Sequence, residues 1–274
     1  MRRDSGEPTQ MDLNRISSCT YPVRDLDPAA AFGIMAAAGV AKVDLWGNMP
    51  HFSLVSVACS LDDLLGKAEA QGVRIANLGS YPGRAFASDN PLVRAAEVKA
   101  LEATLGAAKA LGARSIRIIP GSGEDPAQID RLAPCFAEGA RTAERLGIYM
   151  GMENHAGSLA GSPEHARRLC QAVGSPYFGV LYEPANLMHG GVDYKQAFDL
   201  FHEHIVHIHV KDGKVGPDGF TRTHLGEGDI DYRWVIDSLE SIGYQGDYAL
   251  EYEICDLEAI ETGLPRWVEY FRAL

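Results

Sequence analysis

The sequence predicts an α/β protein built as a single closed (β/α)8 barrel, the TIM barrel, on three observations. Short β-branched or apolar runs alternate along the chain with Ala-, Leu-, Glu- and Arg-rich stretches of helical spacing. Eight such strand–helix units fit into 274 residues, a length close to the roughly 250 residues of this barrel. No G-x-G-x-x-G motif follows the first expected strand, so a dinucleotide-binding sheet has no support.

The expected strands are runs of five or six residues, and the helices between them are longer. We place strands at 15–20, 42–46, 73–78, 115–119, 148–153, 178–182, 205–210 and 248–252. We place helices at 28–38, 61–71, 91–111, 126–146, 163–173, 194–203, 232–242 and 257–273. A strand followed by a helix throughout the chain favours a closed parallel barrel over an open sheet.

The chemistry of the helix ends supports these boundaries. Four helices begin with a side chain that can cap the helix and a proline in the first turn, namely Asp27-Pro28, Asn90-Pro91, Asp125-Pro126 and Ser162-Pro163. Six helices are followed by a glycine, which suits a left-handed C-cap, namely Gly39, Gly72, Gly112, Gly147, Gly174 and Gly243. Helix, glycine and strand therefore recur in a constant order.

We expect one domain over residues 15–274, because no linker or change of composition interrupts this pattern. Residues 1–14 are polar and contain Gly and Pro, so we expect them to be a flexible N-terminal segment. That segment lacks the apolar stretch of a signal peptide, and no window is apolar enough to span a membrane. The sequence leaves the oligomeric state open, with a homodimer or homotetramer compatible.

Composition excludes some classes of partner and site. Lys and Arg number 25 against 37 Asp and Glu, and the resulting net charge of −12 disfavours binding to nucleic acid. The five cysteines are an odd number and lie far apart without a C-x-x-C pair. They predict reduced thiols in a cytoplasmic protein rather than a disulfide scaffold or a cysteine zinc site.

The alternation of side chains along the last four expected strands places an acid or an imidazole inside the barrel at the end of each. The inward residues are Glu153, Glu183, His209 and Glu251. A single carboxylate there is best explained as a structural ion pair. Three carboxylates at one barrel mouth repel one another unless a cation neutralises them, so the group predicts one divalent metal ion.

Three carboxylates and one imidazole favour a fairly hard, six-coordinate ion, with Mn²⁺ or Mg²⁺ ahead of Co²⁺ or Zn²⁺. Four protein ligands leave two positions for a chelating hydroxy-ketone. The expected substrate is therefore a small polyol or keto-sugar of carbohydrate metabolism. The metal would polarise the carbonyl of the keto-sugar.

Five segments in the C-terminal half of the chain resemble the xylose isomerase-like TIM barrel superfamily of sugar phosphate isomerases and epimerases. They are GMENHAG (151–157), YEPANLMHGG (182–191), VHIHVKDG (206–213), THLGEGDIDY (223–232) and YALEYE (248–253). The N-terminal run TYPVRDLDPAAAFGIMAAAGVAKVDLW is similar to the first two strand–helix units of that group. Each motif alone is weak, whereas the ordered set is specific for the superfamily.

The resemblance implies that Glu153, Glu183, His209 and Glu251 are the metal ligands. It also implies that Glu153 and Glu251 are the catalytic acid/base pair on opposite faces of the substrate. Three departures accompany it. Glu183 and Asp44 stand where the group commonly has Asp and Glu, and Asn186 replaces a histidine of the ketose epimerases. The histidine-rich zinc cluster of the abasic-site endonucleases is missing around 222–224, so we do not expect DNA cleavage.

Further residues are candidates for substrate binding, each with a plain structural alternative. Four of them lie in segments that follow the last four expected strands, namely His155, Asn186, Lys211 and Arg222. His207 shares a face with His209 and is better explained by packing. Instead of binding substrate, Lys211 could form an ion pair with Asp212. Glu253 is best explained as a solvated carboxylate at the end of a strand. His51 would reach over the mouth, and Trp46 and Tyr81 would form an apolar wall.

Three functions remain open at this level. The leading one is a metal-dependent isomerase or epimerase that removes and returns a proton beside a carbonyl. The second is a dehydratase of the inosose or dehydroshikimate type, a lyase that expels a hydroxyl instead. The third, a sugar-binding barrel without catalysis, fits less well because Glu153 and Glu251 are both retained.

Overall fold

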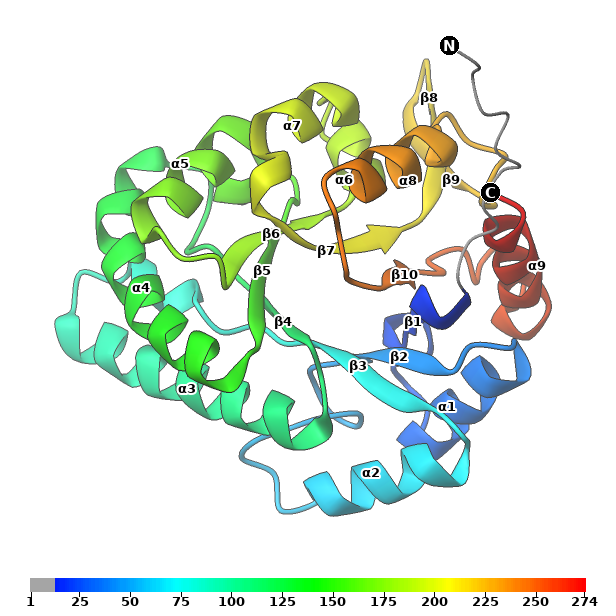
Figure 1. Cartoon of the computed structure of the whole chain (residues 1–274), viewed down its shortest axis with the longest axis horizontal. Coiled ribbons are helices and arrows are strands. Elements are labelled where there is room, and N and C mark those ends of the chain that lie inside the picture. The colour runs from blue at the N-terminus through cyan, green and yellow to red at the C-terminus, as the bar shows by residue number, and fades with distance from the viewer. Residues whose placement is uncertain (1–12) are drawn as a thin grey trace, which may run out of the picture.

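The computed structural model describes residues 13–274, and its described part contains a closed barrel of parallel strands with helices on the outside (Figure 1). Neighbouring strands follow the order β1-β10-β7-β6-β5-β4-β3-β2, and β2 closes the ring by pairing with β1. The strands are β1 (Ile16–Cys19), β2 (Lys42–Trp46), β3 (Arg74–Gly79), β4 (Ser115–Ile118), β5 (Tyr149–Glu153), β6 (Phe178–Tyr182), β7 (Ile205–Val210) and β10 (Tyr248–Leu250). The predicted (β/α)8 barrel is confirmed.

The helices differ from the expected ranges by a few residues at their ends. They are α1 (Pro28–Ala37), α2 (Leu61–Ala70), α3 (Pro91–Leu111), α4 (Ile129–Leu146), α5 (Pro163–Val173), α6 (Pro184–His189), α7 (Tyr194–Phe201), α8 (Tyr232–Ser241) and α9 (Ile260–Arg272). Side chains of Asp27, Asn90, Asp125 and Ser162 accept the capping hydrogen bonds expected of them. The six predicted C-terminal glycines all have positive φ, between 66° and 81°.

Strand alternation divides the barrel into an outer apolar layer and an inner polar mouth. Met150 and Met152 of β5 are fully buried among the helices, whereas Gly151 and Glu153 face inward. Gly179 of β6 is required by close packing, because a Cβ there would lie 2.0 Å from the carbonyl oxygen of His204. Since the apolar side chains anchor each strand in one phase, the polar residues at the strand ends are held at the mouth.

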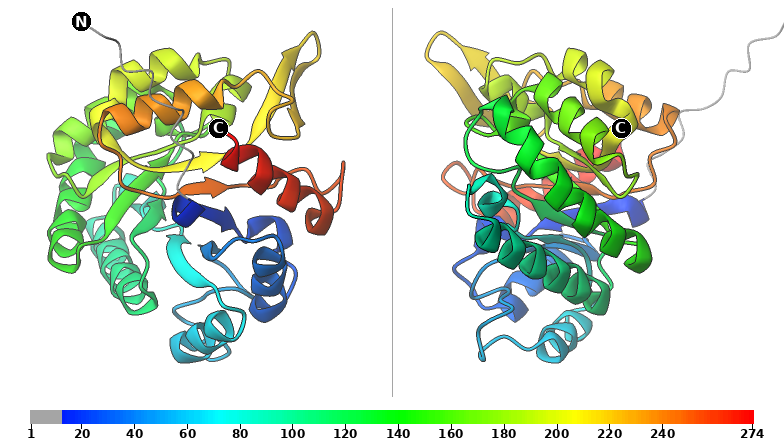
Figure 2. Two further views of the ribbon diagram at one scale, coloured as in Figure 1. Left: turned by 45° about the vertical axis from the view of Figure 1, so that its right-hand side comes forward. Right: turned by 90° about the vertical axis from the view of Figure 1, so that its left-hand side faces the viewer.

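Two elements were not expected from the sequence. The short helix α6 follows β6 directly, and a hairpin of β8 (Asp212–Gly216) and β9 (Gly219–Thr223) follows β7. The hairpin projects beyond the barrel in both views of Figure 2. Its base is fixed by the Asp212 carboxylate, which accepts hydrogen bonds from the backbone amides of Gly213, Gly226, Gly228 and Ile230.

The barrel forms one domain, as predicted. The segment 1–14 that we expect to be flexible lies almost entirely outside the described residues. Within residues 13–274, no helix combines the length and apolar character needed to cross a membrane. All five cysteines are free, with Cys19 and Cys170 buried and Cys255 exposed.

Candidate active site

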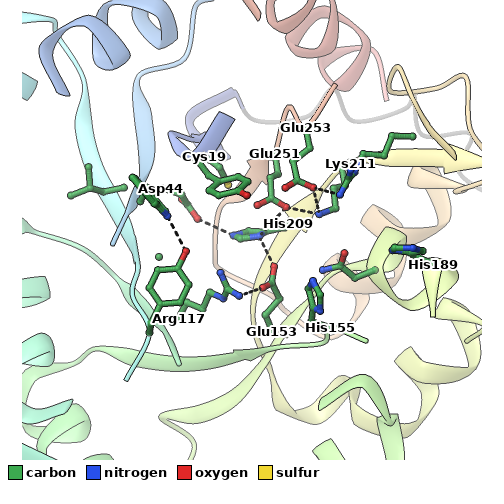
Figure 3. Close-up of a pocket in the computed structure, with 17 residues that line it drawn as sticks. Cys19, Asp44, Arg117, Glu153, His155, His189, His209, Lys211, Glu251 and Glu253 are labelled. Carbon is green, nitrogen blue, oxygen red and sulfur yellow. Dashed lines mark hydrogen bonds and ion pairs between the residues drawn. The ribbon is translucent and has the colours of Figure 1, made fainter. Parts of the chain in front are cut away.

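A cavity of about 260 Å³ opens at the ends of the barrel strands (Figure 3). Its wall combines acidic, basic and aromatic side chains. They include Tyr21, Asp44, Trp46, Tyr81, Arg117, Glu153, His155, Asn186, His189, His209, Lys211, Arg222, Glu251 and Glu253. In a barrel of this type, the strand ends are where catalytic residues gather.

Three predicted ligands line the floor of this cavity and a fourth, Glu183, lies buried beneath it. We refer to Glu153, Glu183, His209 and Glu251 as the carboxylate–histidine cluster. All four are buried, and one potential ligand atom from each lies within 4.8 Å of the others. His209 Nδ1 is 3.3 Å from Glu153 Oε1 and 3.6 Å from Glu251 Oε2. The side chains therefore converge on one small volume.

Local backbone contacts place these side chains. Glu153 ends β5, and Glu183 follows β6 as the residue before Pro184 of α6. The Asn154 side chain joins the two strand ends, because Nδ2 donates to the carbonyl of Glu183 and Oδ1 accepts from its amide. Glu251 follows β10, and its amide donates to Val210 of β7. Each ligand is thus fixed to a strand end.

The burial of the cluster shifts its protonation. Burial raises the pKa of Glu183 to about 8 and outweighs the opposing effect of Lys211. Burial is also the largest single effect on Glu153 and opposes its charge, but the Arg117 guanidinium and His209 together outweigh burial and hold the pKa of Glu153 at about 2. Lys211 and His209 likewise overcome burial and keep the pKa of Glu251 well below its usual range. Cations thus determine which carboxylates are charged.

Lys211 pairs with three of the acidic side chains. Its ammonium lies 2.8 Å from Glu183 Oε2, Glu251 Oε2 and Glu253 Oε2, and its side chain is 6% exposed. On the other side of the cavity, Arg117 Nη2 lies 2.6 Å from Glu153 Oε2. Both predicted acid/base glutamates therefore have one oxygen paired with a cation.

Asp44 organises the residues beneath the cluster. Its Oδ1 accepts hydrogen bonds from Ser17 and Asn77, and its Oδ2 lies 2.6 Å from His207 Nε2 and 3.5 Å from His209 Nε2. Because Asp44 faces Nε2 of His209, the other ring nitrogen is directed toward the carboxylates (Figure 3). Such an outer carboxylate fixes the orientation of a histidine ligand.

The cluster fits a divalent metal ion. Both carboxylate oxygens of Glu183 and Nδ1 of His209 are buried without a hydrogen bond to any described group, although Lys211 forms an ion pair with Glu183. Buried polar atoms normally have partners. Three carboxylates with one imidazole are a donor set suited to Mn²⁺, Mg²⁺ or Zn²⁺.

Most of the other candidate residues also line the cavity. His155, Asn186, Lys211, Arg222 and Trp46 are among the wall residues. Asn186 is buried, and its Nδ2 has no hydrogen-bond partner in the described chain. Tyr81 lies beside Trp46, whose Nε1 donates a 2.9 Å hydrogen bond to the tyrosine hydroxyl. The predicted wall of Trp46 and Tyr81 is therefore present.

Two predicted substrate contacts are not supported by the structure. His51 is buried away from the cavity wall, where its ring bonds the Thr20 hydroxyl and the Leu26 carbonyl. His207 is also buried outside the wall and pairs with Asp44, in agreement with a packing role. Long-range contacts that the sequence does not reveal hold both rings.

Two further expectations are corrected. Glu253 is not a solvated carboxylate, because its side chain is 16% exposed and pairs with Lys211 and Arg222. Lys211 does not pair with Asp212, because its ammonium contacts Glu183, Glu251 and Glu253. The Asp212 carboxylate instead accepts hydrogen bonds from backbone amides at the base of the hairpin. Arg222 belongs to strand β9 of the hairpin.

Sequence reasoning missed Arg117, which belongs to β4. The signal was available, because Ser115 and Arg117 alternate with the buried Ile116 and Ile118. A charged residue at an inward position near the mouth is a candidate site residue. His189 was also missed, because it lies in the unexpected helix α6 and stacks on Phe220 of the hairpin.

Known proteins provide independent evidence on the family. The xylose isomerase-like TIM barrel family matches residues 32–273. L-ribulose-5-phosphate 3-epimerase UlaE of Salmonella paratyphi A is 27% identical over 244 residues, which cover 85% of this chain and 80% of the relative.

Solved structures agree in fold. A structure of L-ribulose 3-epimerase has a TM-score of 0.73 at 18% identity and covers 94% of this chain and 96% of its own. A structure of IOLI protein with a bound zinc atom has a TM-score of 0.74 at 16% identity, with 94% and 96% covered. The epimerase names among these relatives agree with the expectation of an enzyme. Because the family match extends over most of the sequence, this chain belongs to the xylose isomerase-like TIM barrel family.

Proposed function

We propose that this chain is a metal-dependent isomerase or epimerase of a small keto-sugar or related polyol. The observation that carries the proposal is the convergence of the four buried side chains of the carboxylate–histidine cluster at the barrel mouth. The epimerase name of the curated relative supports the same class of reaction. The ion we expect is Mn²⁺ or Mg²⁺, with Co²⁺ or Zn²⁺ as alternatives.

Glu153, Glu183, His209 and Glu251 would hold the ion. Such an ion supplies Lewis acidity, which polarises a substrate carbonyl and makes the proton on the adjacent carbon easier to remove. The donor atoms of Glu183 fit a ligand role alone, because this carboxylate is fully buried and does not line the cavity.

Glu153 and Glu251 would exchange the substrate proton. They lie 3.3 Å and 3.6 Å from His209 Nδ1, on different strands, and both line the cavity. One carboxylate removes a proton from carbon, and the other delivers a proton to the opposite face. Arg117 and Lys211 stabilise the charged forms of these acids, while Trp46 and Tyr81 cover an apolar face of the sugar.

Glu153→Gln and Glu251→Gln test this assignment, since glutamine keeps a carbonyl oxygen for the metal but lacks a basic carboxylate. We expect each variant to retain metal and to lose about 10²–10⁴-fold in turnover. Glu253→Gln is a matched control outside the cluster. Proton exchange in D₂O, followed by NMR, identifies the half-reaction that each variant still performs. Near wild-type turnover by both variants on a verified substrate would refute the pair.

A second candidate, a lyase, rests on the position of Lys211. Its ammonium lies in the cavity wall 2.8 Å from Glu251, where it can donate a hydrogen bond to a departing hydroxyl and stabilise the negative charge that develops on it. Product NMR in D₂O separates the two reactions. Incorporation of deuterium at one carbon without loss of water indicates an isomerase or epimerase, whereas loss of water indicates a lyase.

A further inference from the structure

Arg117 is held in a fixed orientation at the wall of the cavity. Its Nη2 lies 2.6 Å from Glu153 Oε2, and the guanidinium carbon lies 4.9 Å from the centre of the Tyr81 ring. The tyrosine is itself fixed by the Trp46 indole through the hydrogen bond to its hydroxyl. Figure 3 shows Arg117 directed toward Glu153 at the edge of the cavity. The guanidinium is therefore oriented before any ligand binds.

Much of the hydrogen-bonding capacity of Arg117 is unused. A guanidinium has five N–H donors in one plane, and Glu153 is the one ion-pair partner that Arg117 has among residues 13–274. Nε is buried and makes no hydrogen bond within that part of the chain. A buried donor without an acceptor is unfavourable, so the group is suited to a ligand that supplies acceptors.

The position of Glu153 in the cluster gives a second reason why Arg117 needs an acceptor from a ligand. Its Oε1 faces His209 within the cluster, while its Oε2 faces Arg117. When a divalent ion shares the charge of Glu153, Arg117 loses part of its counter-charge in a site where its side chain is only 21% exposed. A buried cation needs an anionic partner, and a planar guanidinium fits a carboxylate with two parallel hydrogen bonds.

We propose that Arg117 binds a carboxylate of the substrate next to its hydroxy-ketone group, so that the substrate is a keto-sugar acid rather than a neutral sugar. This inference rests on the proposed function, because the cluster defines where the hydroxy-ketone lies. The acid group must be close to the reacting carbons, since Arg117 touches a residue of the cluster itself. A phosphate at the far end of a sugar chain would not reach it.

Three small achiral probes test the proposal without knowledge of the sugar configuration. Hydroxypyruvate and dihydroxyacetone share a hydroxy-ketone and differ in one group, which is a carboxylate in the first and a hydroxymethyl in the second. Dihydroxyacetone phosphate carries a phosphate ester instead. Binding of each to the Mg²⁺-loaded protein is measured by ligand-observed NMR titration.

The wild-type protein should bind hydroxypyruvate about tenfold or more tightly than dihydroxyacetone, as expected for an added charge-assisted pair. The ratio should fall close to one in Arg117→Met and partly recover in Arg117→Lys, which keeps the charge without the planar fork. Arg74→Met is the control, because this exposed arginine of β3 is not part of the cavity wall, and it should retain the wild-type ratio.

Several results would overturn the proposal. They are a ratio near one in the wild type, a ratio unchanged in Arg117→Met, or no hydroxypyruvate binding at tens of millimolar. If the wild type instead prefers dihydroxyacetone phosphate and Arg117→Met loses that preference, Arg117 binds a phosphate and the carboxylate proposal is wrong. A titration with Mg²⁺ and Mn²⁺ comes first, and it distinguishes failure of the proposed function from failure of the Arg117 proposal. Absence of metal binding refutes the proposed function, whatever the results with the three probes.

Discussion

Lys211→Met should destabilise the metal-free protein because it removes a cation surrounded by acids. The ammonium contacts Glu183, Glu251 and Glu253 at 2.8 Å each, and the side chain is 6% exposed. Methionine retains most of the aliphatic volume and leaves buried carboxylates without their counter-ion. Breaking a buried pair in this way costs about 3–5 kcal/mol.

That free energy corresponds to a fall in melting temperature of roughly 10 °C for a domain of this size. The assay is calorimetry in EDTA at pH 8, and then again with excess Mn²⁺. Since the metal replaces the missing positive charge, we expect Mn²⁺ to raise the melting temperature of the variant more than that of the wild type. Protonation of Glu183 relieves part of the repulsion, so the deficit in EDTA should shrink as the pH is lowered.

Lys195→Met provides the control. Lys195 pairs with Asp231 at 3.3 Å, but the two side chains are 40% and 51% exposed, so this pair contributes less than about 1 kcal/mol. Equal melting temperatures of Lys211→Met and wild type in EDTA would refute the interpretation of Lys211 as the internal counter-ion.

Two further predictions concern metal binding. Asp44→Asn should weaken Mn²⁺ affinity about 10–100-fold in a calorimetric titration, because the amide orients His209 less well, and unchanged affinity would show that Asp44 has no such role. Mn²⁺ affinity should rise from pH 6 to pH 8, because the ion displaces protons from Glu183 and His209. Burial raises the pKa of Glu183 to about 8. The pKa of His209 is raised, despite burial, by Cys19, Glu251 and Asp44. Titration in buffers of different ionisation enthalpy counts the released protons, and the absence of any release would contradict this prediction.

The main elements of the fold were predictable because the strands and helices carry strong local signals. Buried strands such as Phe178–Tyr182 are short apolar runs, and glycine or capping residues mark the helix ends. The β8–β9 hairpin was missed because most of its residues are exposed, so burial on one side does not impose an alternating pattern. Helix α6 spans six residues, which are too few for helical periodicity.

The site was predictable to the extent that strand alternation determines it. The inward phase of Glu153, His209 and Glu251 brings them together as expected. The same rule would have identified Arg117 of β4. The position of His51 was not predictable in this way, because contacts with the distant Thr20 and Leu26 fix its ring.

The central claim is that the carboxylate–histidine cluster binds one divalent ion. Mn²⁺ titration of chelator-treated protein tests it directly, with metal analysis of protein purified without chelator as an independent measure. We expect one ion per chain in the wild type and marked loss of binding in Glu183→Ala and His209→Ala, with Glu253→Ala as the control that retains it. Unchanged stoichiometry and affinity in both cluster variants would contradict the account.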